Sequence, residues 1–394
     1  MNLERGFDVK NYFFMFREKI YYGSDIIMRT YLVTGGAGFI GSNFIKYILE
    51  KHQYIKIICL DKLTYAGNLA NIEEDLNNNP EKLTFIKGDI NNSELVEYIF
   101  DQWDINYIVN FAAESHVDRS IEDAEIFLKT NVLGVQNLLN IAKDKWETGE
   151  REYKDDVKFL QVSTDEVYGS LGNEGYFTEG TNIQPNSPYS ASKASADMLV
   201  RSYNETHNLP TLITRCSNNY GPYQFPEKLI PLMINNILNG EELPVYGDGL
   251  NVRDWLYVKD HCKAIDMVLE KGEAGEVYNI GGHNEETNIK IVKTLIKEIN
   301  KLLEENDEYK EVANIELNNI NEDLITFVKD RLGHDKRYAI DPSKIKKEIG
   351  WEPTIMFEDG IIDTIKWYLD NQDWLKLITS GDYKNYYEEM YLDR

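Results

Sequence analysis

Short apolar runs alternate with longer amphipathic stretches over the first half of the chain, a pattern typical of strands alternating with helices. The candidate strands are residues 31–33, 55–60, 83–87, 107–111, 159–162 and 211–214. Strands that are joined through helices form a parallel sheet with helices on both faces. We therefore predict the α/β class, with a Rossmann-like, doubly wound parallel sheet.

Apolar residues at helical spacing predict the intervening helices. Ile40, Phe44 and Ile48 share one face of a helix after the first strand. Longer helices are predicted over residues 123–145 and 357–368. We consider two interpretations of the 123–145 helix. In the first, its second face packs on a partner subunit. In the second, the helix only covers the sheet.

The alternation of strands and helices becomes less regular in the second half of the chain. This change suggests how the chain divides into segments. We expect residues 28–217 to form the Rossmann domain and residues 218–394 to form a smaller, mixed portion that shares its cleft. Residues 1–27 form an N-terminal extension without the apolar core of a signal peptide, unless Met28 is the true start. The acidic, Asn-rich residues 302–321 predict a surface insertion.

A glycine motif joins the first strand to the first helix. The sequence TGGAGFIGS places Gly35, Gly38 and Gly41 three residues apart. Such glycines allow a tight turn and bring the backbone close to a pyrophosphate, which the helix N-terminus binds through its free N–H groups. Because a strand precedes the motif and a helix follows it, we predict a dinucleotide-binding loop.

Residues at the ends of the next strands fit the rest of a dinucleotide. Asp61 follows the last glycine by about 20 residues, where a carboxylate accepts hydrogen bonds from both ribose hydroxyls. A 2′-phosphate would meet a like charge there, so NAD is favoured over NADP. Asp89 is predicted beside the adenine, and the small Ala112 and Ala113 leave room for the cofactor. His116 could be catalytic, but a solvent-facing or structural histidine is the favoured interpretation.

A hydroxyl and two carboxylates follow the fifth strand. Thr164, Asp165 and Glu166 stand where ligands bind in an open α/β sheet. Two adjacent acids can act as one proton donor and one acceptor if their surroundings separate their pKa values. The alternative is that the acids only cap the next turn.

A tyrosine and a lysine follow one helical turn apart. Ser187 and Pro188 are typical of a helix start, which places Tyr189 and Lys193 on one face at i and i+4. An ammonium group beside a phenol lowers its pKa, so Tyr189 becomes a candidate base near neutral pH.

The amino-acid composition argues against some classes of function. The chain of 394 residues has 42 basic and 67 acidic residues, a net charge of −25. This charge argues against a nucleic-acid or anionic-membrane binder, which needs a positive surface. Three cysteines, Cys59, Cys216 and Cys262, lie far apart. This spacing favours a reduced, cytoplasmic setting without a metal site.

Scattered polar and cationic residues of the second half are candidate phosphate ligands in an otherwise acidic chain. They are Lys228, Arg253, Asn288, Arg331 and His334. Each of them alone is more typical of a surface residue.

Several segments between Thr34 and Asp341 together match a known family. They are TGGAGFIGS, DKLTYAGN, FAAESHVDRSI, STDEVYG, YSASKAS, TRCSNNYGPYQFPEKLIPL, RDWLYVKDH and DRLGHDKRYAID. On these segments the chain resembles the extended short-chain dehydrogenase/reductases, and within them the dTDP-glucose 4,6-dehydratases. Related 4-epimerases typically lack the acid pair after the fifth strand. Leu332 stands where the family usually has proline.

The resemblance implies a NAD-dependent hydro-lyase that converts dTDP-glucose to dTDP-4-keto-6-deoxyglucose. Tyr189 would take the proton of the sugar 4-hydroxyl, and Thr164 would hydrogen-bond that oxygen. Glu166 would remove the carbon 5 proton, Asp165 would protonate the departing 6-hydroxyl, and Lys193 would bind the nicotinamide ribose. The family is dimeric and serves deoxysugar biosynthesis, including rhamnose biosynthesis.

The resemblance also implies the residues that bind the cofactor and the nucleotide sugar. The expected NAD contacts are Gly35, Gly38, Phe39, Ile40, Gly41, Asp61, Lys62, Leu63, Thr64, Asp89, Ile90, Phe111, Ala112, Ala113, Thr130, Tyr189, Lys193 and Asn219. The expected substrate contacts are Ser115, Thr164, Asn218, Lys228, Leu229, Pro244, Val245, Tyr246, Arg253, Asn288, Asp330, Arg331 and His334.

Two alternatives remain beside this interpretation. One is another NAD-dependent nucleotide-sugar enzyme of the same fold: a dehydratase for a different nucleotide, a decarboxylase or a 4-epimerase. Physical reasoning from the residues does not separate thymidine from uridine or cytidine. The other alternative is a non-catalytic NAD-binding regulator, which would be expected to lack part of the Tyr-Lys or acid pairs.

Overall fold

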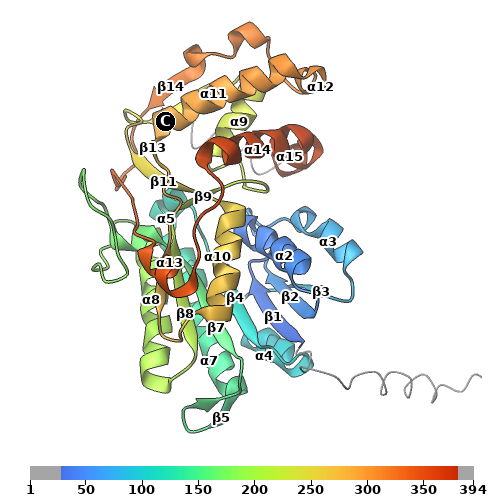
Figure 1. Cartoon of the computed structure of the whole chain (residues 1–394), viewed down its shortest axis with the longest axis vertical. Coiled ribbons are helices and arrows are strands. Elements are labelled where there is room, and N and C mark those ends of the chain that lie inside the picture. The colour runs from blue at the N-terminus through green and yellow to red at the C-terminus, as the bar shows by residue number, and fades with distance from the viewer. Residues whose placement is uncertain (1–27, 380–394) are drawn as a thin grey trace, which may run out of the picture.

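A seven-stranded parallel sheet forms the centre of the protein in a computed structural model that describes residues 28–379 (Figure 1). Its strand order is β12-β8-β7-β4-β1-β2-β3. The strands are β1 (Arg29–Thr34), β2 (Ile55–Asp61), β3 (Leu83–Lys87), β4 (Tyr107–Asn110), β7 (Lys158–Thr164), β8 (Thr211–Cys216) and β12 (Val277–Ile280). The predicted doubly wound α/β fold is therefore confirmed. The predicted N-terminal extension, residues 1–27, lies outside the described residues.

Helices cover both faces of this sheet. On one face α2 (Phe39–Lys51) and α10 (Val258–Lys271) pack on side chains such as Tyr31 and Val33. On the other face α4 (Ser93–Gln102), α7 (Val135–Trp146) and α8 (Pro188–His207) pack on Leu32 and its neighbours. Successive residues of β1 thus enter opposite cores, which explains why the strands are apolar on both sides.

The chain returns to the sheet after residue 217. Strand β12 pairs in parallel with β8 at the sheet edge, and α10 packs against α2. Strand β12 was not among the predicted strands. It has only four residues, and the segment around it shows no clear alternation of strands and helices. The second half of the chain thus supplies the strand β12 and the helix α10 to the Rossmann layer.

The helix predicted over residues 123–145 is interrupted by a wide turn. It consists of α6 (Ala124–Leu128), a π-helical turn η2 (Lys129–Gly134) and α7. Such turns occur often at functional sites. Here the turn carries Thr130, an expected NAD contact.

The second portion is mixed and has its own core. Strands β9 (Asn218–Tyr220), β11 (Val252–Tyr257) and β13 (Glu285–Thr287) form one small sheet, and β10 (Leu243–Tyr246) and β14 (Ile325–Val328) form another. Around them pack α9 (Leu229–Asn239), α11 (Asn288–Glu305), α14 (Phe357–Asp370) and α15 (Gln372–Ile378). Figure 1 shows this portion stacked on one end of the Rossmann layer.

Residues 302–321 differ in part from the predicted surface insertion. The segment begins as the last turns of α11, continues through α12 (Asp307–Lys310), and buries Leu303 and Ile320 in the core of the second portion. Its acidic residues remain exposed, but isolated apolar residues anchor the segment. Periodicity did not indicate this, because the two anchors lie on different elements.

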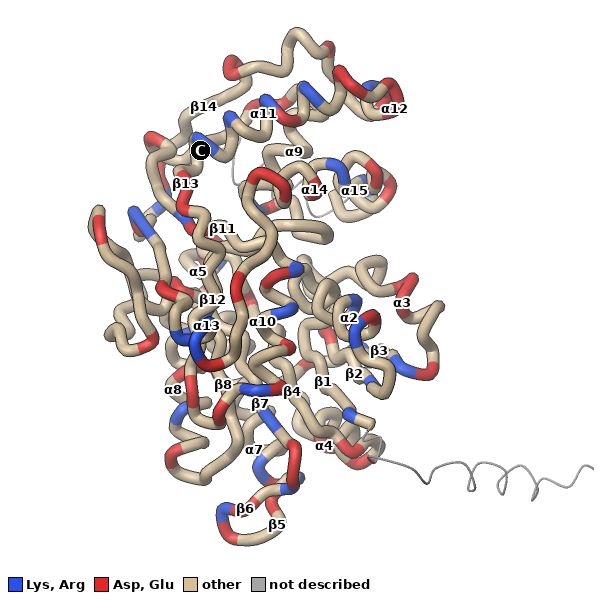
Figure 2. The backbone as a smooth tube through the Cα atoms, in the orientation of Figure 1, with Lys and Arg blue, Asp and Glu red and all other residues tan. Residues whose placement is uncertain are grey.

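Shorter elements complete the described chain. They are α3 (Glu73–Asn78), α5 (Val117–Glu122), α13 (Ser343–Ile349), the hairpin β5 (Glu147–Gly149) with β6 (Glu152–Tyr153), and the 3-10 turns η1 (Leu69–Asn71), η3 (Asp165–Tyr168), η4 (Leu317–Asn319) and η5 (Glu322–Leu324). Figure 2 shows acidic residues on both portions of the molecule. Among residues 28–379, no helix is long and apolar enough to cross a membrane.

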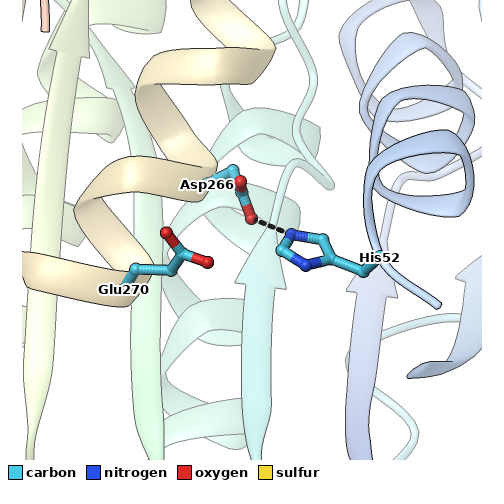
Figure 3. A group of neighbouring side chains, drawn as sticks. All are labelled: His52, Asp266 and Glu270. Carbon is cyan, nitrogen blue, oxygen red and sulfur yellow. Dashed lines mark hydrogen bonds and ion pairs between the residues drawn. The ribbon is translucent and has the colours of Figure 1, made fainter. Parts of the chain in front are cut away.

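An ion-pair cluster joins the end of α2 to α10 (Figure 3). His52 Nε2 lies 2.8 Å from Asp266 Oδ1, with Glu270 one turn further along α10. The Lys51 ammonium group contacts the second oxygen of the buried Asp266. A cation of the chain therefore already neutralises this carboxylate, and the cluster fixes α10 against the glycine-loop helix.

Candidate active site

One cavity collects most of the predicted residues at the carboxyl ends of the central strands. The expected NAD contacts that line it are Gly35, Gly38, Phe39, Ile40, Gly41, Asp61, Lys62, Thr64, Asp89, Ile90, Phe111, Ala112, Ala113, Thr130, Tyr189, Lys193 and Asn219. The expected substrate contacts Ser115, Thr164, Asn218 and Lys228 line it as well. Leu63 does not line the cavity; its backbone N–H donates to Asp61 Oδ1 at 2.7 Å.

The glycine loop is packed too closely for larger residues. A Cβ atom on Gly41 would lie 2.3 Å from the carbonyl oxygen of Gly35. Gly35 has a φ of +68°, and a Cβ there would lie 2.6 Å from the backbone nitrogen of Ala112. The loop thus needs glycine at both positions, and it forms a cradle of the kind that admits a pyrophosphate.

Asp61 is a buried acid at the end of β2 rather than an exposed loop residue. Its Oδ2 accepts from the backbone N–H of Ala37 at 2.9 Å, which ties the acid to the glycine loop. Nearby, Lys62 forms an ion pair of 2.9 Å with Asp89. Burial raises the pKa of Asp89, but Lys62 and the hydrogen bonds from Asn91 together outweigh burial, so the net pKa is lowered. These charges lie where the adenosine half of a dinucleotide was predicted.

The acid pair follows β7 in the turn η3 and does not itself cap that turn. Thr164 is the capping residue, because its Oγ1 accepts from the backbone N–H of Glu166 at 3.3 Å. Asp165 is 1% exposed, its Oδ1 lies 3.4 Å from Thr164 Oγ1, and its Oδ2 has no hydrogen-bond partner among the described residues. A buried acid with a free oxygen at a cavity wall is available to a ligand.

The surroundings of the two acids differ in charge. Burial raises the pKa of Asp165 well above its usual value, and the nearby carboxylates of Glu166 and Asp254 raise it further. Burial also raises the pKa of Glu166, but its charged neighbours Arg331, Arg253 and Lys228 act in the opposite direction. The environment therefore favours a protonated Asp165 and, relative to it, an ionised Glu166.

Tyr189 and Lys193 project from α8 into the cavity, as their spacing predicted. The helix begins with a capping box of Ser187 and Ser190, with Pro188 in its first turn. The predicted lowering of the tyrosine pKa is wrong for the chain alone. Burial raises the pKa of Tyr189 well above its usual value, and the negative charges of Glu166 and Asp165 contribute.

Lys193 is bonded to the sheet rather than to the tyrosine. Its Nζ donates to the carbonyl oxygen of Val162 at 2.7 Å. Burial lowers its pKa, and Asp197, one turn further along α8, opposes that effect. The spacing i and i+4 placed both residues on one helix face, but side-chain length decided their partners.

Sequence reasoning missed two buried residues near the cavity. Glu227 lines it and accepts from Tyr65 Oη at 3.2 Å, with Lys228 Nζ 3.7 Å away. His261 Nδ1 lies 2.9 Å from Asn219 Oδ1, and burial lowers the pKa of His261 to about 3. Glu227 directly precedes the predicted Lys228, which was the available signal; His261 lies on α10 and gave none.

The remaining predicted substrate residues lie outside the cavity lining, and Tyr246, His334 and Asp330 among them form a second cluster. Tyr246 Oη donates to Asp118 at 3.2 Å, its ring lies 6.2 Å from that of His334, and His334 Nδ1 lies 2.6 Å from Asp330. Arg253 is buried over the Tyr338 ring. Leu229, Pro244, Val245, Asn288 and Arg331 also lie outside the cavity lining. His116 is buried and does not line the cavity either.

Comparisons with known proteins agree with this geometry. The family model described as GDP-mannose 4,6 dehydratase matches residues 32–364. A dTDP-glucose 4,6-dehydratase of Xanthomonas campestris pv. campestris (strain B100) is 50% identical over 357 residues, which cover 91% of this chain and 98% of the relative.

Solved structures give the same result. The dTDP-glucose 4,6-dehydratase of Bacillus anthracis in complex with NAD has a TM-score of 0.76 and 49% identity, covering 89% of this chain and 99% of that one. DesIV, a dTDP-glucose 4,6-dehydratase of Streptomyces venezuelae with NAD bound, has a TM-score of 0.78 and 43% identity, with the same coverage.

Proposed function

We infer that this chain, which belongs to the GDP-mannose 4,6 dehydratase family, is a NAD-dependent hydro-lyase that converts dTDP-glucose to dTDP-4-keto-6-deoxyglucose and water. The observation that carries the proposal is that one cavity is lined by both a Tyr-Lys pair and an Asp-Glu pair. A 4-epimerase needs only the first pair, whereas elimination of water needs an acid and a base in addition.

The cavity suits NAD. The glycine cradle accepts a pyrophosphate, and Asp61 at the end of β2 accepts ribose hydroxyls while repelling a 2′-phosphate. When bound, NAD supplies a hydride acceptor that later gives the hydride back, so the net redox change is zero. Lys193 would hold the nicotinamide ribose, and Thr130 and Asn219 would complete the site.

Tyr189 acts in the oxidation of carbon 4. Its phenolate oxygen takes the proton of the 4-hydroxyl, and Thr164 hydrogen-bonds the same oxygen. The Lys193 ammonium group would favour the phenolate, as would the positive charge that bound NAD would bring, and both would oppose the burial effect described above. The 4-keto group then acidifies the proton on carbon 5.

Glu166 and Asp165 divide the elimination between them. Burial raises the pKa of Glu166 less than that of Asp165, because three cations oppose the effect, and Glu166 takes the carbon 5 proton as a base. Asp165, held protonated by burial and like charges, gives its proton to the departing 6-hydroxyl as an acid. This is the arrangement in which environment separates the roles of two carboxyl groups.

The nucleotide-sugar ligands are part of the same proposal. Ser115, Asn218, Lys228, Leu229, Pro244, Val245, Tyr246, Arg253, Asn288, Asp330, Arg331 and His334 would bind the sugar and the nucleotide diphosphate. Support comes from the basic residues Lys228, Arg253 and Arg331, whose charges all act on Glu166 at the cavity wall. A diphosphate beside these residues would bridge the cavity and the second cluster.

We also place two finer features in this proposal. A homodimer is supported by exposed apolar residues around α5 to α8, namely Ile121, Ile126, Leu128, Leu133 and Met198, which suit an interface between copies. A cytoplasmic role in deoxysugar biosynthesis, such as that of rhamnose, fits three free cysteines and a deoxysugar product.

Product analysis tests the activity. The purified protein is incubated separately with dTDP-glucose, UDP-glucose, CDP-glucose and GDP-mannose, without an added hydride acceptor. The masses of the products are then measured by mass spectrometry. Loss of one water from dTDP-glucose alone is the expected result. Loss from a different nucleotide sugar alone would change the substrate, and no loss from any of the four would overturn the proposed reaction.

A further inference from the structure

The last described helix, α15, contacts the nucleotide-binding part of the molecule from the second portion. Its Leu375 and Ile378 are buried in the core of the second portion. Its Trp374 contacts the Rossmann portion instead, because the indole Nε1–H donates a hydrogen bond to Asn71 Oδ1 in η1 at 2.8 Å. Figure 1 shows α15 above α2 and α3, close to this contact. A helix from the end of the described chain is therefore bonded to a turn near its beginning.

Asn71 extends this contact to the glycine loop. The residue is 2% exposed, and its Nδ2 donates to the carbonyl oxygen of Ala37, which lies within TGGAGFIGS, at 2.8 Å. The backbone N–H of the same Ala37 donates to Asp61 Oδ2 at 2.9 Å. An unbroken series of hydrogen bonds thus runs from Trp374 to the acid that ends β2.

An asparagine suits the middle of this series. An indole N–H can only donate a hydrogen bond, and a backbone carbonyl oxygen can only accept one. The amide of Asn71 satisfies both, since its oxygen faces Trp374 and its NH₂ group faces Ala37. Loss of the indole donor would leave the buried amide oxygen without this partner, which is costly in a protein interior.

The preceding helix, α14, supports a second part of the cavity wall. Its buried Tyr368 donates through Oη to the carbonyl oxygen of Gln224. Gln224 Nε2 donates to the carbonyl oxygen of Asn219 at 2.9 Å, and both residues line the cavity. The rings of Tyr368 and Trp374 pack edge to face, with centroids 6.2 Å apart. The two helices thus support the cavity at two places.

We propose that Trp374 is a positioning residue for NAD, and that docking of α15 holds the glycine loop and Asp61 in the geometry that binds the dinucleotide. Trp374 acts through Asn71 and does not itself line the cavity. With α15 docked, the Ala37 peptide is held from both sides, so NAD has less of the loop to order and binds more tightly. The inference rests on the NAD binding of the proposed function, but not on its reaction.

A coupling of this kind acts in both directions. If docking of α15 strengthens NAD binding by some factor, bound NAD must strengthen the docking of α15 by the same factor. NAD should therefore slow hydrogen exchange at the backbone amides of α15, a helix that does not line the cavity. A tryptophan that only fills space in the core predicts no such effect.

A matched pair of variants tests the contact. Trp374→Phe keeps an aromatic ring beside Tyr223 and Trp367 but removes the indole N–H. Trp367→Phe makes the same change in the same aromatic cluster, 4.9 Å away between ring centroids, and leaves the bond to Asn71 intact. The affinity of each full-length protein for NAD is measured by isothermal titration calorimetry. Hydrogen exchange of residues 372–378 is followed by mass spectrometry with and without saturating NAD.

We expect Trp374→Phe to raise the Kd for NAD by about three- to tenfold, the usual effect of one hydrogen bond. Trp367→Phe should leave the Kd unchanged. At saturating NAD, Trp374→Phe should dehydrate dTDP-glucose at the wild-type rate, because the reacting residues are not altered. In the wild type, NAD should slow exchange in α15 by a similar factor, and Trp374→Phe should lose this protection.

Three results would overturn the proposal. The first is an unchanged affinity for NAD in Trp374→Phe. The second is an equal loss of affinity in Trp367→Phe, because packing of the cluster would then be responsible. The third is exchange in α15 of the wild type that NAD does not slow, a result that depends on no variant. A wild type that shows the coupling but does not dehydrate dTDP-glucose would overturn the proposed reaction and support this inference.

Discussion

At the scale of single residues, the two neighbouring acids are distinguished by what surrounds them. Carboxylates are the leading charged neighbours of Asp165, whereas cations from distant parts of the chain are the leading charged neighbours of Glu166. Their order in the sequence does not assign acid and base. The asymmetry of the surrounding charges does, and it makes two residue-level predictions.

Replacement of Glu166 by glutamine should stop elimination and spare the oxidation of carbon 4. The amide keeps the size of the side chain but cannot accept the carbon 5 proton. We expect the dehydration rate to fall by about 10²- to 10⁴-fold, the usual contribution of a general base, while reduced cofactor still forms. Absorbance of NADH together with product mass measures both steps. Glu304→Gln, at an exposed position of α11, is the matched control, and normal dehydration by Glu166→Gln would disprove the base assignment.

Replacement of Asp165 by asparagine should stabilise the fold at neutral pH while it removes the acid. Because the folded-state pKa of Asp165 is raised, its contribution to stability is fully present below the unfolded-state value near 3.8 and is lost as pH rises through the raised value. The variant escapes that loss. Its free energy of unfolding at pH 8 should therefore exceed that of the wild type.

Urea unfolding of both proteins at several pH values checks this prediction. The advantage of Asp165→Asn should shrink as the pH falls toward 4. A variant that is less stable than the wild type at pH 8 would show that Asp165 is ionised and well solvated in the fold.

At the scale of elements, strand ends and helix starts bring the chemistry together. β1 delivers the glycine loop to α2, β7 delivers the acid pair in η3, and the capped start of α8 delivers Tyr189. Each junction depends on local features: close packing at glycine, a threonine cap, or a capping box. The glycine junction offers the sharpest comparison, because another glycine of the chain lies in open space.

Replacement of Gly41 by alanine should weaken NAD binding. The added Cβ would meet the Gly35 carbonyl oxygen at 2.3 Å and push the loop away from the pyrophosphate. We expect the affinity for NAD to fall by at least about tenfold, or about 1.4 kcal/mol, as measured by isothermal titration calorimetry. Gly172→Ala is the control, since a Cβ there meets nothing within 4 Å. Equal affinity in the two variants would contradict the cradle.

At the scale of the whole molecule, the second portion closes the site. On the first portion, apolar residues of α6 to α8 remain exposed. α10 joins the two portions, because it packs on α2 and carries both Asp266 and His261. The exposed apolar residues of α6 to α8 have no cover within the described chain. This surface motivates the proposed homodimer.

Replacement of Leu133 by glutamate should shift the protein toward the monomer. Leu133 is 52% exposed, and a charge buried there between two copies would be costly. Light scattering after gel filtration gives the mass of each form. Tyr98→Glu on α4, at 54% exposure outside this surface, should leave the mass unchanged. A wild-type protein that is already monomeric at micromolar concentration would contradict the dimer.

The sequence by itself determined the features that depend on neighbours along the chain. Apolar runs predicted six strands of the central sheet, and the motifs placed Gly41, Asp61, Thr164 and Tyr189 at a common edge, where the structure has them. Local spacing suffices here, because the carboxyl ends of parallel strands all meet at one edge of a sheet.

Only the tertiary structure decided the features that depend on neighbours in space. It added β12 to the sheet, anchored residues 302–321, surrounded Glu166 with Arg253 and Arg331, and reversed the expected pKa shift of Tyr189. Burial and Coulomb interactions act between atoms that the fold brings together, whatever their separation along the chain. No periodicity or motif encodes those distances, so the charges that distinguish the acid from the base emerge only once the chain is folded.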